Sequence, residues 1–196
     1  MKIATLLLPV IALSACGVLK PVEDHSENHI LAAISPSRAV TGNTPSIAIA
    51  RPSLPGYIDR QQLVTRSRNG TIVMNANQIW AEPLDDGIAR VTAENLGIIR
   101  NSMNIQPVQA FITIDYTHLL EMRVSRFDAD AGTRSVVLEC TWKLQPVSGR
   151  VAPARAFRTE VPIEDPGFSA ASPQQQRVQA MNQALAELAA VIARQL

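Results

Sequence analysis

The clearest pattern along the chain is a strict alternation of apolar and more polar residues between positions 136 and 144. Successive side chains of a β-strand point to opposite faces, so a period of two predicts a strand with one buried side. The predicted buried face carries Val136, Leu138, Cys140, Trp142 and Leu144, and the other face carries Val137, Glu139, Thr141 and Lys143.

Two segments instead show apolar residues at the spacing of three and four that is typical of a helix. One begins at Ser172-Pro173, a capping serine followed by proline at the first helical position, and its stripe is Val178, Met181, Leu185, Leu188 and Ile192. The other covers residues 82–100, with Pro83 and acidic residues in its first turn. Its predicted stripe is Leu84, Ile88, Val91, Asn95 and Ile98, widened by Leu96 and Ile99.

Shorter apolar stretches predict the remaining strands. They occupy residues 29–34 as a first edge strand, 47–51, 71–74 with an exit over 75–78, 111–116, 121–127 and 156–161. Pro55-Gly56 indicates a turn, residues 58–66 a short helical turn followed by extended chain, and residues 128–132 a hairpin loop. A loop is expected over residues 35–45.

Together these elements predict one α/β domain of the α+β type. It has a mixed, largely antiparallel sheet with two long helices on one face. No internal repeat is visible at solenoid periods.

The N-terminal segment has the three parts of a secretory signal. Lys2 supplies a positive charge, residues 3–13 are mostly apolar, and Leu13-Ser14-Ala15-Cys16 reads as a lipobox. Cys16 is then acylated and becomes the first residue of the mature protein. The expected organisation is a lipoprotein signal peptide over residues 1–15, lipidated Cys16 with a flexible tether over 16–28, and a domain over 29–196.

Two alternatives to a lipoprotein signal exist. The apolar run is too short for a transmembrane helix, which needs about 20 residues. A soluble secreted protein, cut by the ordinary signal peptidase, would leave Cys16 incidental. Gly17 stands where many inner-membrane lipoproteins carry Asp, so we expect a protein anchored in the outer membrane and facing the periplasm.

Charge and cysteine content argue against nucleic-acid binding and against an intrachain disulfide. A formal net charge of +1 gives no electrostatic case for nucleic-acid binding, which requires a basic face. With Cys16 lipidated, Cys140 has no partner for an intrachain disulfide, and its place on an apolar face predicts a buried thiol. The covalent lipid on Cys16 is the only attached group we expect, and no further cofactor is expected.

Few residues form patterns that indicate catalysis or metal binding. There is no glycine-rich phosphate loop, no G-x-S-x-G and no C-x-x-C motif. His25 and His29 are spaced for a metal on a helix but fall in the tether, so solvated histidines are expected. His118 lacks a positioned nucleophile and is expected at the surface or at a strand end. Residues 128–132 lack the later glutamate of a calcium loop. No catalytic or metal-binding residue is therefore predicted, and the protein is not expected to be an enzyme.

The arginines at positions 51, 60, 66 and 68 allow two interpretations. They form a solvated face with local ion pairs, such as Asp59 with Arg60, or they form a surface for a partner, since arginine is enriched at interfaces.

Two sequence blocks resemble those of the PqiC family of ABC-type transport auxiliary lipoproteins. Residues 51–66 read RPSLPGYIDRQQLVTR, and residues 79–84 read IWAEPL. They are similar to the family's L-P-x-Y-L-D-R, I-V-T-R and W-A-E-P-L pieces, and Val124-Ser125-Arg126-Phe127-Asp128 is similar to its V-x-R-F-D. With His29-Ile30-Leu31 in place of the family's Tyr-x-Leu, the first edge strand departs most from this pattern.

The resemblance implies a non-enzymatic role in the cell envelope. Such proteins are held at the inner leaflet of the outer membrane, associate with an MCE-domain protein that forms a lipid tunnel, and assemble as a ring-shaped homo-oligomer. The expected function is therefore that of a subunit of an MCE-type intermembrane lipid transport system that supports envelope integrity. Arg60 and Arg66 are the candidate partner-binding residues, whereas Trp80 is expected in the core.

Two other functions remain open from the sequence. One is a structural lipoprotein that aids the maturation of another outer-membrane component, which an exposed apolar patch would favour. The other is a hydrolase that uses His118, which loss of function in His118→Ala would support.

Overall fold

The computed structural model of the protein describes residues 25–34, 45–108, 115–164 and 171–196. The predicted signal peptide, Cys16 and the tether up to residue 24 lie outside the described residues. So do nearly all of the predicted loop over 35–45 and most of the predicted strand over 111–116.

A mixed sheet of eight strands forms the centre of the described part of the chain. Strands β6, β7 and β8 pair antiparallel in that order. The short strands pair mostly in parallel, including β2 and β3 with opposite ends of β6 and β1 with β4. The strands are β1 (Glu27–His29), β2 (Ile47–Ile49), β3 (Gln62–Arg66), β4 (Ile72–Trp80), β5 (Ile105–Pro107), β6 (His118–Asp130), β7 (Ser135–Pro146) and β8 (Arg155–Pro162).

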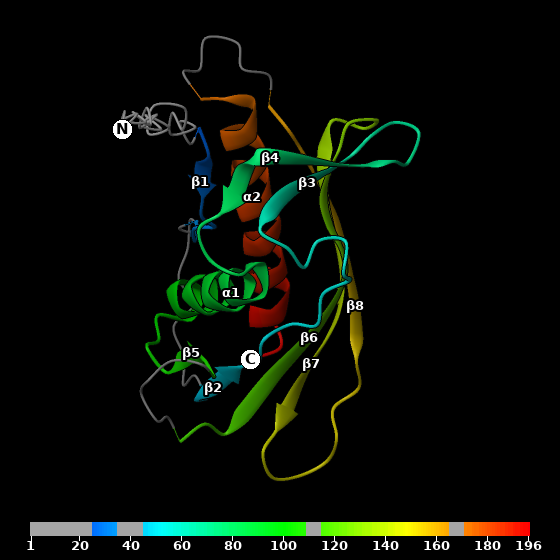
Figure 1. Ribbon diagram of the computed structural model, residues 1–196. Coiled ribbons are helices and arrows are strands. Elements are labelled where there is room, and N and C mark those ends of the chain that lie inside the picture. Colours follow the sequence, from blue (N-terminus) through cyan, green and yellow to red (C-terminus); the bar gives the residue numbers. More distant parts are fainter. Residues whose placement is uncertain (1–24, 35–44, 109–114, 165–170) are drawn as a thin grey trace, which may run out of the picture.

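Two helices, α1 (Leu84–Arg100) and α2 (Pro173–Ala193), complete the domain. Figure 1 shows both on the same side of the layer formed by β6, β7 and β8. Helix α2 packs against β7, β8 and α1, whereas α1 packs against α2 and β5. The predicted α+β domain, with its mixed sheet and two long helices, is therefore confirmed.

The start of α2 is the capped start that the sequence predicts. The Oγ atom of Ser172 accepts from the backbone N–H of Gln175 at 3.2 Å, and the Gln175 side chain accepts from the Ser172 N–H at 2.7 Å. This reciprocal capping box satisfies backbone donors that a helix start leaves unpaired. Helix α1 differs, because Pro83 is its N-cap residue and no side chain caps it.

The core lies between the helices and the sheet. The alternating face of β7 is buried at Val136, Leu138, Cys140 and Trp142, and so is the predicted stripe of α2. Three single positions differ from the prediction, and one of them is Leu144, which is only partly buried. Ile98 of α1 is 39 % exposed, and Val137, on the other face of β7, is only 1 % exposed.

The predicted edge strand over residues 29–34 is wrong. The strand is β1, which ends at His29, and residues 30–34 follow without strand pairing. The side chains of the two helices bind their backbone instead. Asn182 accepts from the Ala32 N–H and Asn95 accepts from the Ile34 N–H, both at 3.0 Å, while Arg90 donates to the Leu31 carbonyl at 2.8 Å. Backbone groups satisfied in this way do not need a neighbouring strand.

Several boundaries also differ from the prediction. Strand β4 continues to Trp80, through residues 75–78 that were expected to be an exit, because β1 pairs with its last three residues. Strand β6 continues to Asp130, so the hairpin turn occupies residues 131–134 rather than 128–132. Within the described residues, no helix is long and apolar enough to cross a membrane.

Candidate functional site

A β-bulge in β6 brings charged residues to the face of the sheet that points away from α2. Before the bulge Val124 lies opposite Cys140, and after it Arg126 lies opposite Glu139, so the register shifts at Ser125. A one-residue insertion moves the following side chains to the other face. Phe127 therefore points into the core, while Arg126 and Asp128 point to the opposite face.

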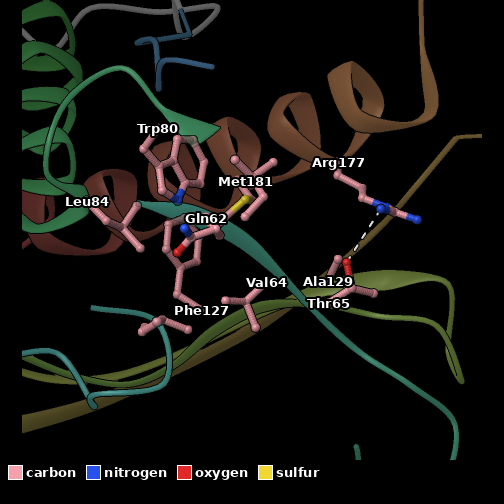
Figure 2. Close-up of a pocket in the computed structure, with 11 residues that line it drawn as sticks. Gln62, Val64, Thr65, Trp80, Leu84, Phe127, Ala129, Arg177 and Met181 are labelled. Atoms are coloured by element: carbon pink, nitrogen blue, oxygen red, sulfur yellow. Dashed lines mark hydrogen bonds between the residues drawn. The ribbon is translucent and has the colours of Figure 1, made fainter. Parts of the chain in front are cut away.

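Figure 2 shows the inner side of this arrangement. Phe127 lies near Trp80, Leu84 and Met181 around a small cavity of about 10 Å³, which has room for one water at most. Trp80 is 7 % exposed. The prediction that Trp80 belongs to the core is therefore confirmed.

Asp128 is the centre of the polar side. Its carboxylate is fully buried and accepts from the Tyr57 hydroxyl at 2.7 Å, from Arg66 at 3.4 Å and from Arg126 at 3.0 Å. A buried carboxylate is stable only when charges and hydrogen bonds compensate it. We call these four residues the Asp128 cluster.

Local structure explains why these residues meet. The Pro55 carbonyl accepts from the N–H groups of Ile58 and Asp59, at 3.0 and 3.2 Å, and this turn places Ile58 in the core while Tyr57 reaches the sheet. Strand β3 then runs parallel to the end of β6, with Arg66 paired to Asp130. Two sequence blocks that are more than 60 residues apart thus supply one cluster.

Contacts within the Asp128 cluster shift the pKa values of Tyr57 and Arg66. Burial, followed by the hydrogen bond to Asp128, raises the pKa of Tyr57 to about 12. Burial alone would lower the pKa of Arg66, but the hydrogen bonds and charges of Asp128 and Tyr57 together outweigh it, so that pKa is raised. The Arg66 guanidinium also stacks over the Tyr57 ring, 5.5 Å from its centroid.

Arg126 connects the cluster to the hairpin turn. It donates to Asp130 at 2.6 Å, and this hydrogen bond is the main reason why the pKa of Asp130 is lowered. The other Asp130 oxygen accepts from the Gly132 N–H at 2.8 Å. Asp130 thus stabilises the hairpin turn, whereas Asp128 belongs to the cluster. Among the described residues, no group of three His, Cys, Asp or Glu side chains is arranged to hold a metal ion.

The two candidate partner-binding arginines have different surroundings. Arg66 belongs to the Asp128 cluster, and its side chain is 27 % exposed. Arg60 does not pair with Asp59 in the way the sequence suggested. It donates to the Gly56 carbonyl at 2.9 Å and contacts the sulfur of Met74 at 2.8 Å. Arg51 pairs with Asp86 at the start of α1.

The remaining titratable candidates do not assemble into a site. His29 was expected to be solvated, but it is 8 % exposed and its Nε2 atom lies 2.5 Å from the Gln78 side-chain oxygen. His118 begins β6 and contacts Thr117, which confirms a strand-end histidine. Cys140 is buried as predicted, and burial raises the pKa of its thiol to about 12.

Sequence reasoning missed two features. One is the binding of residues 30–34 by Asn95, Asn182 and Arg90, since an asparagine on an apolar helix face gives no sign of a distant backbone partner. The other is a cavity beside Gln176 and Arg177 at the start of α2. Its lining comes from four separate segments, and no spacing along the chain indicates it.

Comparisons with solved structures place the fold among known ones. A crystal structure of an uncharacterised protein matches with a TM-score of 0.66 and 19% identity, covering 87% of this chain and 97% of that one. A DUF330-family protein from Xanthomonas campestris matches with a TM-score of 0.63 and 19% identity, covering 85% and 94%. A PelC dodecamer from Paraburkholderia phytofirmans matches more distantly, with a TM-score of 0.35, 14% identity and coverage of 79% and 92%.

A search of curated protein sequences finds no match. A family model does match, over residues 29–193, which is nearly the whole described domain. The chain therefore belongs to the family of ABC-type transport auxiliary lipoprotein components.

Proposed function

We propose that this protein is an outer-membrane-anchored lipoprotein subunit of an MCE-type intermembrane lipid transport system. The observation that carries the proposal is the family match over residues 29–193 together with the lipobox Leu13-Ser14-Ala15-Cys16. In this role the lipid on Cys16 holds the domain at the periplasmic side of the outer membrane. The domain docks with an MCE-domain protein, which forms the lipid tunnel. Through this docking the lipoprotein supports envelope integrity.

The proposed role is one of docking rather than catalysis. The most buried carboxylate of the candidate site, Asp128, has its hydrogen-bonding capacity taken up by Tyr57, Arg66 and Arg126. A general acid or base needs a group that can reach a substrate. The Asp128 cluster instead fixes the loop around Tyr57 to the sheet and so sets the position of the neighbouring surface.

Arg60 and Met74 are the side chains that we assign to the partner surface. They contact each other at 2.8 Å, and Met74 is 49 % exposed. Arginine and methionine are both enriched at the cores of protein interfaces. Arg66 holds the neighbouring loop in place through Asp128 and Tyr57.

We further propose that the protein assembles as a ring-shaped homo-oligomer, in which each subunit is anchored by its own lipid. A conduit of this kind needs several copies around one axis, and cyclic symmetry provides that closure. The mass of the detergent-solubilised protein, measured by light scattering, tests this part of the proposal. A monomer at micromolar concentration would contradict it.

Copurification tests the docking proposal. The full-length protein and an MCE-domain protein of the same cell are coexpressed and solubilised in detergent, and the lipoprotein is then captured. We expect the MCE-domain protein to be recovered with wild type and reduced at least severalfold with Arg60→Glu. Arg150→Glu, a charge reversal at an exposed residue of the β7–β8 loop, is the matched control. Failure to recover the MCE-domain protein with wild type contradicts the proposal.

An assembly factor for another outer-membrane component is the second candidate function. It is favoured by a wide groove of about 680 Å³ beside α1, where Ile98 and Met103 are 39 % and 88 % exposed. Exposed apolar side chains beside a groove are typical of interaction sites. This alternative would be supported if wild type captured a maturing outer-membrane protein and no MCE-domain protein, and if Met103→Asp lost that capture.

A further inference from the structure

Strand β4 leaves most of one backbone edge open. Strand β3 pairs with one side of it, and on the other side β1 pairs only with residues 78–80. Within the described part of the chain, no strand lies beside residues 72–77 on that second side. Residues 73–77 are all exposed, with Val73 at 51 % and Met74 at 49 %. Figure 1 shows the end of the β3–β4 hairpin reaching past the layer of β6, β7 and β8.

The backbone groups of Ile72 and Met74 face this open edge. At the start of the hairpin the Ser67 N–H donates to the Thr71 carbonyl at 2.8 Å. Along an antiparallel ladder, residues bonded to the neighbouring strand alternate with residues that are not. The backbone of Thr71 and Val73 is therefore directed at β3, and the N–H and C=O groups of Ile72 and Met74 point away from it. Such groups can pair with a further strand.

This edge lacks the features that usually prevent an exposed strand from pairing with another chain. Protected edges carry charges or proline, or are very short. Residues 69–81 contain neither a charged residue nor a proline. By contrast, β8 carries two arginines and ends at Pro162, and β1 and β5 have only three residues each. Among the described strands, the edge of β4 is therefore the one best suited to accept another strand.

The charged residues of the β3–β4 hairpin are all basic. From residue 60 to residue 81 they are Arg60, Arg66 and Arg68, and this stretch has no aspartate or glutamate. Arg66 is paired with Asp128, but among the described residues no carboxylate forms an ion pair with Arg60 or Arg68. Arg68 is exposed in the turn of the hairpin. Because partners have complementary charges, the strand that fits this edge carries carboxylates.

We propose that an extended segment of the MCE-domain partner, with apolar residues and at least one carboxylate, adds to the sheet along residues 72–77. Backbone hydrogen bonds to Ile72 and Met74 hold the added strand, and its side chains provide specificity. Val73 and Met74 lie on opposite faces of β4, so the added strand finds an apolar neighbour on each face. This inference rests on the proposed docking function and specifies how the partner binds.

A second copy of this chain fits the same edge less well. Pairing through its free strand β8 would bring Arg155 and Arg158 toward the arginines of the hairpin, and like charges across an interface are unfavourable. Pairing of β4 with β4 would also bring identical arginines together. It would form a two-fold dimer, which does not close the proposed ring.

Proline substitution tests the backbone contact. Ile72→Pro removes an N–H that faces the open edge and leaves the hydrogen bonds to β3 in place. Ile72→Ala removes the side chain but keeps the N–H, and is the matched control. In the copurification with the MCE-domain protein, we expect recovery to fall severalfold with Ile72→Pro and to remain at the wild-type level with Ile72→Ala. Circular dichroism establishes that both variants are folded.

Hydrogen exchange of wild type provides a test without any substitution. The full-length protein in detergent is compared with its complex, by mass spectrometry that resolves single amides. We expect the amides of Ile72 and Met74 to exchange about tenfold more slowly or less in the complex. The amide of Val73, which already faces β3, should change less. Contact through side chains alone would not produce this alternation.

The outcomes separate this inference from the docking proposal. If wild type recovers the MCE-domain protein and folded Ile72→Pro recovers it equally well, only the strand addition is overturned. The same holds if Ile72 and Met74 exchange equally fast in the free protein and in the complex. Slow exchange of both amides before the MCE-domain protein is added would identify a second copy as the occupant and overturn the inference. Failure of wild type to recover the MCE-domain protein overturns both.

Discussion

The Tyr57 hydroxyl donates a 2.7 Å hydrogen bond to Asp128, a carboxylate with no exposed surface that lies 71 residues further along the chain. This bond joins the turn after Pro55 to the last residues of β6. It also connects two pieces of the family resemblance, residues 51–66 and residues 124–128.

Replacing Tyr57 with phenylalanine tests the strength of this connection. The ring remains to pack under Arg66, but Asp128 loses one donor. We expect Tyr57→Phe to lower the free energy of unfolding by about 1–3 kcal/mol, the usual cost of leaving a buried polar group with too few partners. Urea denaturation measures the change. Tyr116→Phe, at a position that is 38 % exposed, is the control and should change stability by less than about 0.5 kcal/mol.

Charge reversal at the two candidate arginines should have two different outcomes. Arg66→Glu places a second negative charge beside buried Asp128, so we expect a loss of roughly 3 kcal/mol or more in stability. Arg60→Glu loses only contacts with Gly56 and Met74 and should cost less than about 1 kcal/mol. Thermal unfolding followed by circular dichroism compares the two. Equal destabilisation would show that Arg60 is also structural, and Arg60→Glu would then be unsuitable for testing partner binding.

Alkaline conditions should destabilise the fold through two groups. The pKa values of Tyr57 and Cys140 are both raised to about 12 in the folded protein, above the unfolded values of about 10 and 9. Because the folded state retains these protons more tightly, stability is complete below about pH 9 and falls as the pH rises toward 12. Urea midpoints measured across this range should decrease, and the decrease should be smaller in the double variant Tyr57→Phe, Cys140→Ala. If the midpoints fell with pH as steeply in the double variant as in wild type, this assignment would be contradicted.

Asn95 should be necessary for the position of residues 30–34. Asn95→Ala removes the acceptor of the Ile34 N–H, and we expect it to lower the free energy of unfolding by about 1–3 kcal/mol. Hydrogen exchange of the Ile34 amide should become faster. Asn104→Ala, at an exposed position after α1, should leave both measurements unchanged. Unchanged exchange at Ile34 in Asn95→Ala would contradict the role of this side chain.

Cys16→Ala tests the predicted lipid anchor. We expect the variant to fold and to leave the membrane fraction, because the acyl chains that bury methylene groups in the bilayer are missing. Cell fractionation and immunoblotting measure its distribution. Its remaining cysteine, Cys140, should react with a thiol reagent only after denaturation, which shows that the domain is intact. Retention of the folded variant in the membrane fraction would contradict an anchor at Cys16.

The elements with strong periodicity could be predicted from the sequence. The alternation over residues 136–144 and the capped stripe that begins at Ser172 each depend on local chemistry, so β7 and α2 lie where the pattern places them. Strand β1 could not be predicted, because Glu27, Asn28 and His29 have no apolar pattern. Their pairing with β4 is determined by neighbours that are distant along the chain.

The candidate site was predicted only in part, again because contacts between distant segments of the chain form it. Arg60 and Arg66 were identified from composition and resemblance. Only Arg66 pairs with Asp128, because the bulge at Ser125 turns Asp128 away from the core. A bulge of one residue leaves little trace in the apolar pattern, since Val124 and Phe127 are both buried.

The attachment of residues 30–34 to both helices has a mechanical consequence. A pulling force applied to the chain from its N-terminal side first reaches β1 and then this segment. Strand β1 lies parallel to β4, and the next residues are bound in turn by Arg90 at Leu31, Asn182 at Ala32 and Asn95 at Ile34. These bonds must break one after another before the force reaches the core. A domain tethered at this end would thus resist extraction by tension first through the pairing of β1 with β4 and then through side chains of its two helices.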